Sequence, residues 1–273
     1  MSKKQEKLTR KILRLLRQLN CRSYLHHFGP KKFKLVHHLF ALLMMQALKL
    51  SLRRVEKLLK EFEMKVPTFS ALCRSRKKIH SWIWNKLVSL TSGIKHKTVA
   101  VDATGFSKTN PSFHFVKRID RKNPVKSYAK FSMLFDVDKN KIVSFHARTK
   151  HAHEIRDVKK LLSGKKIKTL LADKAYDAEW LHEFCFERGI KTVIPSKKNT
   201  RKGFYRRKQK QNYSDDVYHR RNLVESGFSA MKRKYGGSVA GKSLSAINSE
   251  LSCKALAYNL ELKRQRFSTE PSP

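Results

Sequence analysis

Thr98–Asp102 reads TVAVD, a run of apolar and β-branched residues that is closed by an acid. Such a run predicts a short buried strand. The pattern recurs at Ile167–Ala172, where IKTLLA is followed by Asp173. An acid at the carboxyl end of a strand projects into the crevice where α/β sheets bind their ligands. The simpler interpretation is that each acid caps the turn that follows its strand.

The segments around these strands predict a mixed α/β domain at 95–265, followed by a flexible tail at 266–273. Two alternating segments flank Asp138-Lys-Asn-Lys, which is typical of a β-hairpin. Strand and helix patterns then alternate toward the C-terminus. The further expected elements are strands at 130–137, 141–147 and 190–194, and helices at 154–162, 178–188, 216–235 and 243–263.

Residues 1–94 predict an all-α, helix-turn-helix-like domain before the α/β domain. Apolar residues recur there at helical spacing in four segments, which are 2–20, 35–48, 51–62 and 69–83. The last segment has a basic outer face, and we expect Arg74, Lys77 and Lys78 to contact DNA. A plain helical bundle with a charged surface is the alternative.

Charge narrows the class of partner. The 273 residues include 62 Lys and Arg against 21 Asp and Glu, a formal net charge of +41. An excess of this size points to nucleic acid, whose phosphates give affinity without sequence preference. The most apolar run, 39–48, is too short to span a bilayer, so we expect no membrane partner. Four widely separated cysteines fit reduced thiols in the cytoplasm.

Basic residues are densest at 197–210, which reads KKNTRKGFYRRKQK and contains eight Lys and Arg and no acid. Two aromatic residues lie in the middle of this segment. We expect Arg206 and Arg207 to contact the DNA backbone from here. A solvated loop without a partner is the alternative interpretation.

A third acid, Glu225, lies in RNLVESGFSAMKRKYG at 221–236. On a helix, the core-facing stripe of this segment would contain Val224, Phe228, Met231 and Tyr235. A second stripe, about 60° wide, would contain Tyr218, Arg221, Glu225 and Lys232. Charged groups at such spacing are costly to bury dry, and they suit the wall of a charged cleft.

Three carboxylates in one cleft would repel one another, and divalent cations would relieve that repulsion. Oxygen ligands favour Mg²⁺ or Mn²⁺. Two such ions about 3.5–4 Å apart activate a water or a 3′-hydroxyl and stabilise the leaving oxygen of a phosphodiester. Arg221 and Lys232 would then hold the phosphates beside the scissile bond.

These motifs resemble the DDE-class transposases of prokaryotic insertion sequences, in the branch with a Tyr-x2-Arg-x3-Glu-x6-Lys signature. The stripe from Tyr218 to Lys232 matches that spacing without a gap. VDATGF around Asp102 and ADKAYD around Asp173 resemble the acid motifs of the family. The match covers roughly 95–260, and FSALCRSRKKI in the N-terminal part resembles the helical DNA-binding region of such proteins.

The resemblance implies a ribonuclease-H-like domain in which Asp102, Asp173 and Glu225 bind two Mg²⁺ or Mn²⁺ ions and carry out catalysis. It implies cleavage at the element's ends, followed by attack of the freed 3′-hydroxyl on target DNA. The expected partners are double-stranded DNA, as terminal inverted repeats and as target, and a second copy of the chain on that DNA. The expected location is the cytoplasm, at the nucleoid. The DNA-contacting residues that it implies are Tyr218, Arg221 and Lys232.

Two other interpretations use the same residues. One is a ribonuclease-H-like nuclease or resolvase without strand transfer. The other is a catalytically silent DNA-binding protein derived from a transposase. The presence of all three acids and their basic partners argues against decay of the site.

Overall fold

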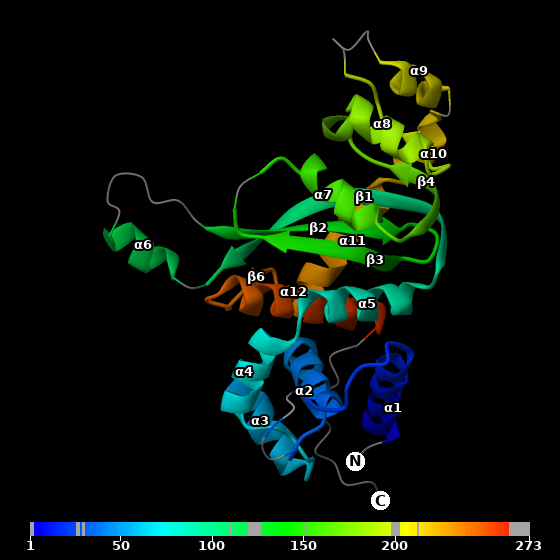
Figure 1. The fold of residues 1–273 in the computed structure, drawn as a ribbon. Coiled ribbons are helices and arrows are strands. Elements are labelled where there is room, and N and C mark those ends of the chain that lie inside the picture. The colour runs from blue at the N-terminus through cyan, green and yellow to red at the C-terminus, as the bar shows by residue number, and fades with distance from the viewer. Residues whose placement is uncertain are drawn as a thin grey trace, which may run out of the picture.

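The computed structural model describes residues 3–25, 28, 31–109, 111–119, 127–150, 152–197, 203–211 and 213–261. The predicted tail at 266–273 lies outside them. In the described residues a six-stranded mixed sheet lies between two layers of helices (Figure 1). The strands are β1 (Lys95–Lys108), β2 (Tyr128–Asp136), β3 (Lys141–Arg148), β4 (Lys166–Leu171), β5 (Lys191–Val193) and β6 (Ser238–Val239).

The sheet has the order β3-β2-β1-β4-β5, and β6 pairs with the far end of β1. The first three strands are antiparallel, so the hairpin predicted around Asp138 is confirmed. β4 and β5 run parallel to β1. The fold class is therefore mixed α/β, as the sequence predicts.

Alternating side chains of β1 enter two separate cores, as expected for a strand buried on both faces. Val99 and Val101 pack in the core beneath α7 (Ile155–Leu162) and α8 (Glu179–Phe186). Ala100 and Phe106 belong to the larger core on the opposite face. That core is formed with α5 (Ser81–Ser92), α11 (Asn222–Tyr235) and α12 (Leu244–Asn259).

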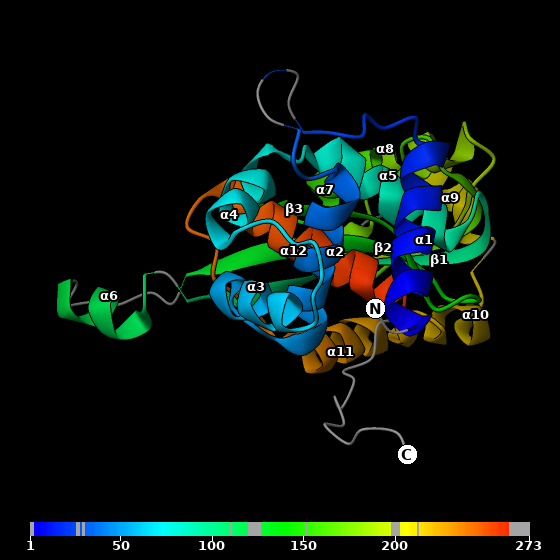
Figure 2. The same ribbon diagram turned by 90° about the horizontal axis from the view of Figure 1, so that it is seen from below.

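The N-terminal helices continue this larger core rather than forming one of their own. They are α1 (Lys3–Gln18), α2 (Leu35–Leu48), α3 (Leu52–Glu61) and α4 (Phe69–Lys78). α12 contacts α2 and α4 as well as α5 and β3, and Figure 2 shows α2 crossing it. Helices occupy all four predicted segments, whereas the division into domains at residue 94 stays a prediction.

Asn259 fastens the end of α12 between α5 and β3. Its Oδ1 accepts from the backbone N–H of Ile142 at 2.8 Å. Its Nδ2 donates to the carbonyls of Ile142 and Val88 and to Thr91 Oγ1, at 2.7, 3.2 and 2.9 Å. Since the side chain is 2% exposed, these bonds satisfy a group that would otherwise be costly to bury.

Two helices predicted as continuous are each divided. The segment 69–83 breaks after α4, and Ile79 leaves the helical region with ψ 109°. The segment 216–235 divides into α10 (Asp215–His219) and α11, separated by Arg220 and Arg221. These adjacent arginines bind different carboxylates, because Arg220 pairs with Asp138 at 2.5 Å and Arg221 pairs with Glu225 at 2.9 Å. Tyr218 therefore lies on a different helix from Glu225, contrary to the single stripe predicted.

β1 is longer than predicted, and Asp102 does not end it. The strand continues to Lys108 because β2 pairs with it antiparallel from Val99 to Ser107. The parallel pairing with β4 stops earlier, at Ala100 and Leu171. Asp102 thus lies just beyond the parallel part of the strand, although the strand itself goes on.

An arm carries α6 (Phe113–Ile119) away from the body of the molecule, between β1 and β2 (Figure 1). None of the residues of α6 is buried. Within the described ranges no single helix is long and apolar enough to cross a membrane, and the pair α2 and α3 meets that length only with a bend of 107°.

Candidate active site

Asp102 and Asp173 occupy equivalent positions at the carboxyl end of the parallel ladder. The last paired residues are Ala100 on β1 and Leu171 on β4, and each acid lies two residues beyond. Ala100 and Leu171 both face the larger core. Because residues two positions apart on an extended strand point to the same face, the two acids are expected on that face as well. The prediction that each acid ends a strand is correct for Asp173, which follows β4, and wrong for Asp102, because β1 continues to Lys108.

Asp102 is the more enclosed of the two, with a side chain that is 21% exposed. Its Oδ1 accepts from the backbone N–H of Ala103 at 2.8 Å, and Arg221 Nη1 lies 3.6 Å from its Oδ2. Burial raises the pKa of Asp102, and the nearby charges of Glu154 and Glu225 add to the rise. The bond from Ala103 and the charge of Arg221 oppose it.

α11 brings Glu225 to this carboxylate. The predicted core stripe of the helix is confirmed, because Val224, Phe228, Met231 and Tyr235 are all buried. Gly227 lets the helix approach the sheet closely, since a Cβ there would lie 2.9 Å from Phe135 Cε2. Glu225 lies on the flank of the helix beside this stripe, and its carboxylate accepts from Arg221 Nη2 at 2.9 Å.

Arg221 therefore lies between two carboxylates, at 3.6 Å from Asp102 and 2.9 Å from Glu225. Its guanidinium carbon is also 6.0 Å from the centre of the Tyr218 ring, within cation–π range. Tyr218 thus stays beside Arg221 although the helix breaks between them.

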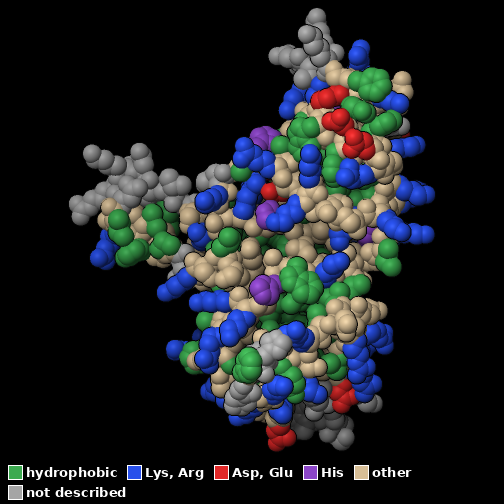
Figure 3. All heavy atoms as spheres, viewed as in Figure 1, with side chains coloured by type: hydrophobic (Ala, Val, Ile, Leu, Met, Phe, Trp, Pro, Cys, Tyr) green, Lys and Arg blue, Asp and Glu red, His purple; other side chains and the backbone are tan. Residues whose placement is uncertain are grey.

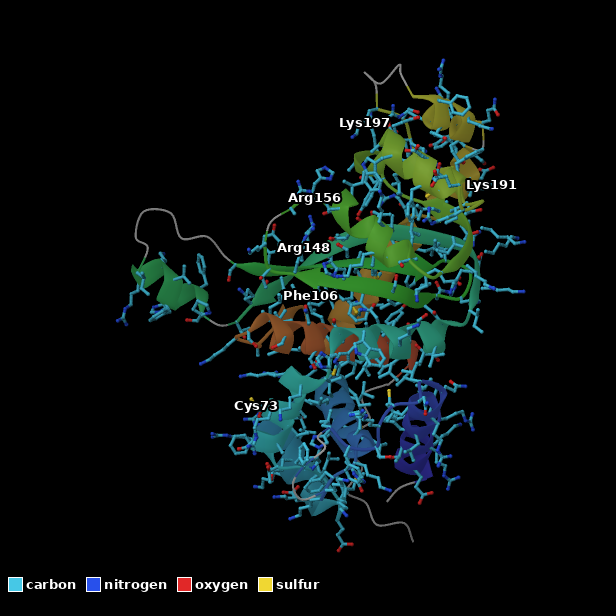
Figure 4. All side chains as sticks on the ribbon, viewed as in Figure 1. Cys73, Phe106, Arg148, Arg156, Lys191 and Lys197 are labelled. Carbon is cyan, nitrogen blue, oxygen red and sulfur yellow. The ribbon has the colours of Figure 1, made fainter. Side chains whose placement is uncertain are left out.

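Lys232 adds a second cation to the site, farther along α11 than Arg221 and beside β1. Its Nζ donates to Thr104 Oγ1 at 2.6 Å and lies 5.3 Å from the centre of the Phe106 ring. Burial lowers the pKa of Lys232. Phe106, labelled in Figure 4, is fully buried in the larger core.

Asp173 is exposed and caps the short 3₁₀ turn η1 (Lys174–Tyr176), where its Oδ1 accepts from the backbone N–H of Lys174 at 2.6 Å. Nowhere in the described part of the chain does a group of three or more His, Cys, Asp or Glu residues lie close enough to hold a metal ion. Arg221 thus contacts both Asp102 and Glu225. Asp173 is related to them only by its equivalent position in the strand register.

Glu154 is a neighbour of the site that sequence reasoning did not assign. It precedes α7, and its carboxylate pairs with Lys130 of β2 at 2.6 Å. The buried hydroxyl of Tyr176 donates to it at 3.2 Å. Because Tyr176 is three residues after Asp173, Glu154 links β2 to the turn that carries the second acid. The only signal in the sequence was a lone acid at the start of a helix, in a chain where acids are rare.

Asp177 fixes the basic segment to the second acid motif. Its carboxylate accepts from Arg206 Nε at 2.7 Å, from the backbone N–H of Lys197 at 2.8 Å and from His182 Nε2 at 3.1 Å. Lys197 lies at the end of the molecule away from the N-terminal helices (Figure 4). The side chain of Arg206 is only 11% exposed. This geometry suits Arg206 to tethering α9 (Phe204–Lys210), whereas Arg207 on the same helix is exposed.

A family model described as the transposase DDE domain matches residues 93–260, more than half of the chain. The chain belongs to this transposase family. A cryo-EM structure of the piggyBac transposase synaptic complex with hairpin DNA is similar over 93% of this chain and 73% of that chain, with 10% sequence identity and a TM-score of 0.44. No curated protein matches the chain.

In this transposase the predicted N-terminal contacts lie on α4, where Arg74, Lys77 and Lys78 are all exposed. Arg76 of the same helix is different, since its side chain is 12% exposed and lies 3.8 Å from Glu250 of α12. The connection from α3 to α4 spans 62–68, which is longer than the three- or four-residue turn of a helix-turn-helix. DNA contact by the exposed residues stays a prediction.

Proposed function

We propose that this protein is the transposase of an insertion sequence, which cleaves DNA at the ends of the element and transfers the freed 3′-hydroxyl into target DNA. The observation that carries the proposal is the cationic wall of Arg221 and Lys232 beside Asp102 and Glu225, in a chain of the DDE family. A ribonuclease-H-like fold for the catalytic part is supported by the sheet order β3-β2-β1-β4-β5, with β4 and β5 parallel to β1.

The residues present fit a divalent cation in donor chemistry and in charge. Arg221 already places one positive group between Asp102 and Glu225, and this charge pairing supports the choice of a cation as their ligand. We propose that Asp102, Asp173 and Glu225 hold two Mg²⁺ or Mn²⁺ ions. When bound, such ions supply an activated water or 3′-hydroxyl and stabilise the leaving oxygen.

The protein's own groups bind and orient the DNA. We propose that Arg221 holds a phosphate beside the scissile bond through two parallel N–H bonds, and that Lys232 holds its neighbour. Thr104 aims Lys232 by accepting its hydrogen bond, and Tyr218 supports the guanidinium of Arg221. These groups stabilise the charge that develops on the cleaved phosphate.

The proposed partners are double-stranded DNA, as terminal inverted repeats and as target, and a second copy of the chain on the paired ends. The net charge of +41 supports binding to the DNA backbone. We propose that the protein works in the cytoplasm, at the nucleoid.

One experiment tests the function directly. Purified protein is incubated with Mg²⁺ and a DNA fragment that holds its own gene and both flanks, and the breaks are mapped at nucleotide resolution. Glu225→Gln, Asp102→Asn and Asp173→Asn serve as matched controls that keep side-chain size. Each should lower cleavage by at least about 10³-fold while DNA affinity stays close to that of the wild type.

The pattern of breaks decides between the interpretations. Discrete metal-dependent breaks at two inverted ends, with joined products, support a transposase. Scattered breaks without joining support a nuclease or resolvase. Tight DNA binding without breaks supports a silent DNA-binding protein. Full cleavage by Glu225→Gln would remove that residue from the proposed catalytic set.

A further inference from the structure

A basic groove of about 1020 Å³ lies at the end of the sheet opposite to the acids. It is formed where β1 and β4 begin and where the chain leaves α7 and α8. Figure 3 shows Lys and Arg side chains projecting along this edge, at the right of the view, and Figure 4 labels Lys191 there. The lining residues include Lys95, Lys97, Lys139, Lys165, Lys166, Lys168 and Arg188.

The strand register places like charges side by side in this groove. Lys95 on β1 is paired with Lys166 on β4, and the same register brings Lys97 beside Lys168. All four side chains are exposed, and they alternate with the buried residues His96 and Ile167. Like charges directly opposite each other on neighbouring strands destabilise a sheet. The folded protein therefore carries an electrostatic cost at this edge.

The carboxylates of the groove are already bound to other groups. Asp138 pairs with Arg220 at 2.5 Å, and Lys97 contributes a weaker attraction that also lowers the pKa of Asp138. Asp136 pairs with His96 at 2.6 Å and with Lys139 of the groove at 3.7 Å. Within the described residues, no carboxylate lies at ion-pair distance from Lys95, Lys97, Lys166 or Lys168. The carbonyl ends of α7 and α8 offset part of the repulsion.

His96 adds a second, independent feature to the groove. Its ring is 2% exposed and lines the groove, and its Nδ1 is bonded to Asp136 Oδ2. Its Nε2 is buried and has no hydrogen-bond partner among the residues that the structure describes. A buried polar atom without a partner is rare in folded proteins and calls for a ligand or water.

Distance separates this groove from the acids. Lys95 and Asp102 are seven residues apart on β1, which corresponds to about 23 Å along a strand. A phosphate at Lys95 therefore lies about seven base pairs away from a phosphate at Asp102 when both belong to one duplex. We propose that this groove binds the backbone of duplex DNA at a distance from the phosphate that is cleaved. The proposal rests on the proposed function for its choice of polyanion.

The test compares two full-length variants that lose the same charge. The groove variant is K95Q/K97Q/K166Q/K168Q. The control variant removes four exposed lysines from four different helices, as K57Q/K117Q/K160Q/K234Q. Binding to a duplex of arbitrary sequence is measured without divalent metal over a series of NaCl concentrations, and melting temperatures are measured without DNA.

We expect the slope of log Kobs against log salt to become shallower by about 3–4 in the groove variant, which is about 0.9 for each lost phosphate contact. The control variant should keep a slope close to that of the wild type. Without DNA, the groove variant should melt about 2–4 °C higher than the wild type, because the paired like charges are gone. The control variant should melt as the wild type does.

Equal slopes in the two variants would overturn the proposal. A lower melting temperature in the groove variant would also overturn it, because the lysines would then stabilise the fold. Metal-dependent cleavage of plasmid DNA at low salt separates this inference from the proposed function. Cleavage by the wild type with equal slopes refutes the groove alone, whereas a shallower groove slope without cleavage refutes the enzymatic function alone.

Discussion

Lys232 Nζ donates a hydrogen bond of 2.6 Å to Thr104 Oγ1, from the last turn of α11 to the part of β1 just past Asp102. The bond fixes one end of a flexible side chain that would otherwise lose rotamer freedom on binding a phosphate. It also explains why a hydroxyl residue stands two positions after the first acid, on the same face of the strand.

Thr104→Val should therefore lower DNA cleavage about 3–10-fold with little change in DNA affinity, because Lys232 is present but no longer aimed. Lys232→Met should cost more, about 10²-fold, because the charge itself is lost. Single-turnover cleavage and binding are measured on the same duplex. A larger loss for Thr104→Val than for Lys232→Met would show that Thr104 acts independently of the lysine.

Tyr176→Phe should lower cleavage about 10-fold, because the hydroxyl that ties η1 to Glu154 is lost beside Asp173.

Glu154→Gln keeps an acceptor but removes a negative charge that adds to the effect of burial in raising the pKa of Asp102. We expect this variant to shift the acidic limb of the pH–rate profile to lower pH, whereas Tyr176→Phe should leave that limb unchanged. Identical profiles for the wild type and Glu154→Gln would contradict an electrostatic role for Glu154.

Gly227→Ala should destabilise the protein although alanine favours a helix. The added methyl would lie 2.9 Å from Phe135 Cε2 and 3.3 Å from Met133 Cε. Such overpacking costs about 1–3 kcal/mol, which exceeds the gain of about 1 kcal/mol from helix propensity. We expect a lower melting temperature and weaker cleavage, because the added methyl would push α11 away from the sheet and would move Glu225 with it. Ser229→Ala, at an exposed position on the same helix, is the control and should change neither.

Stability should fall as the pH is lowered through the range below about 6.5, partly through His182. Burial lowers the pKa of His182, against the opposing effect of its bond to Asp177. The unfolded chain keeps the ordinary value near 6.5, so it gains a proton in this window that the folded protein resists. The contribution of His182 is complete above about pH 6.5 and is lost as the pH falls. His182→Gln should flatten the fall in melting temperature, and an unchanged pH dependence would refute the assignment.

The fold could be predicted from the sequence where burial leaves a local pattern. The alternation of Val99 and Val101 with Ala100 identifies β1, and the apolar stripe of Val224 and Phe228 identifies α11. Each pattern is set by which face of the element meets a core, and that information is local.

The boundaries could not be predicted, because they depend on partners far away in the chain. β1 runs past Asp102 because β2 pairs with it, and the break before α11 coincides with an ion pair between Arg220 and Asp138. No glycine or proline stands next to Asp102 or at the break between α10 and α11 to mark these features in the sequence. The wall of Arg221 and Lys232 was predicted by spacing, whereas Glu154 was missed because only the fold brings it to Tyr176.

The position of α12 has a consequence for synthesis of the chain. Leu251, Ala255 and Leu256 complete a core to which α2, near the opposite end of the sequence, also contributes. During translation, Leu42 and Leu43 of α2 cannot pack against α12 until the chain up to residue 260 has left the ribosome. A chain that stops before Leu244 would expose this apolar surface, so a late nonsense mutation should yield an aggregating product rather than a free-standing DNA-binding fragment.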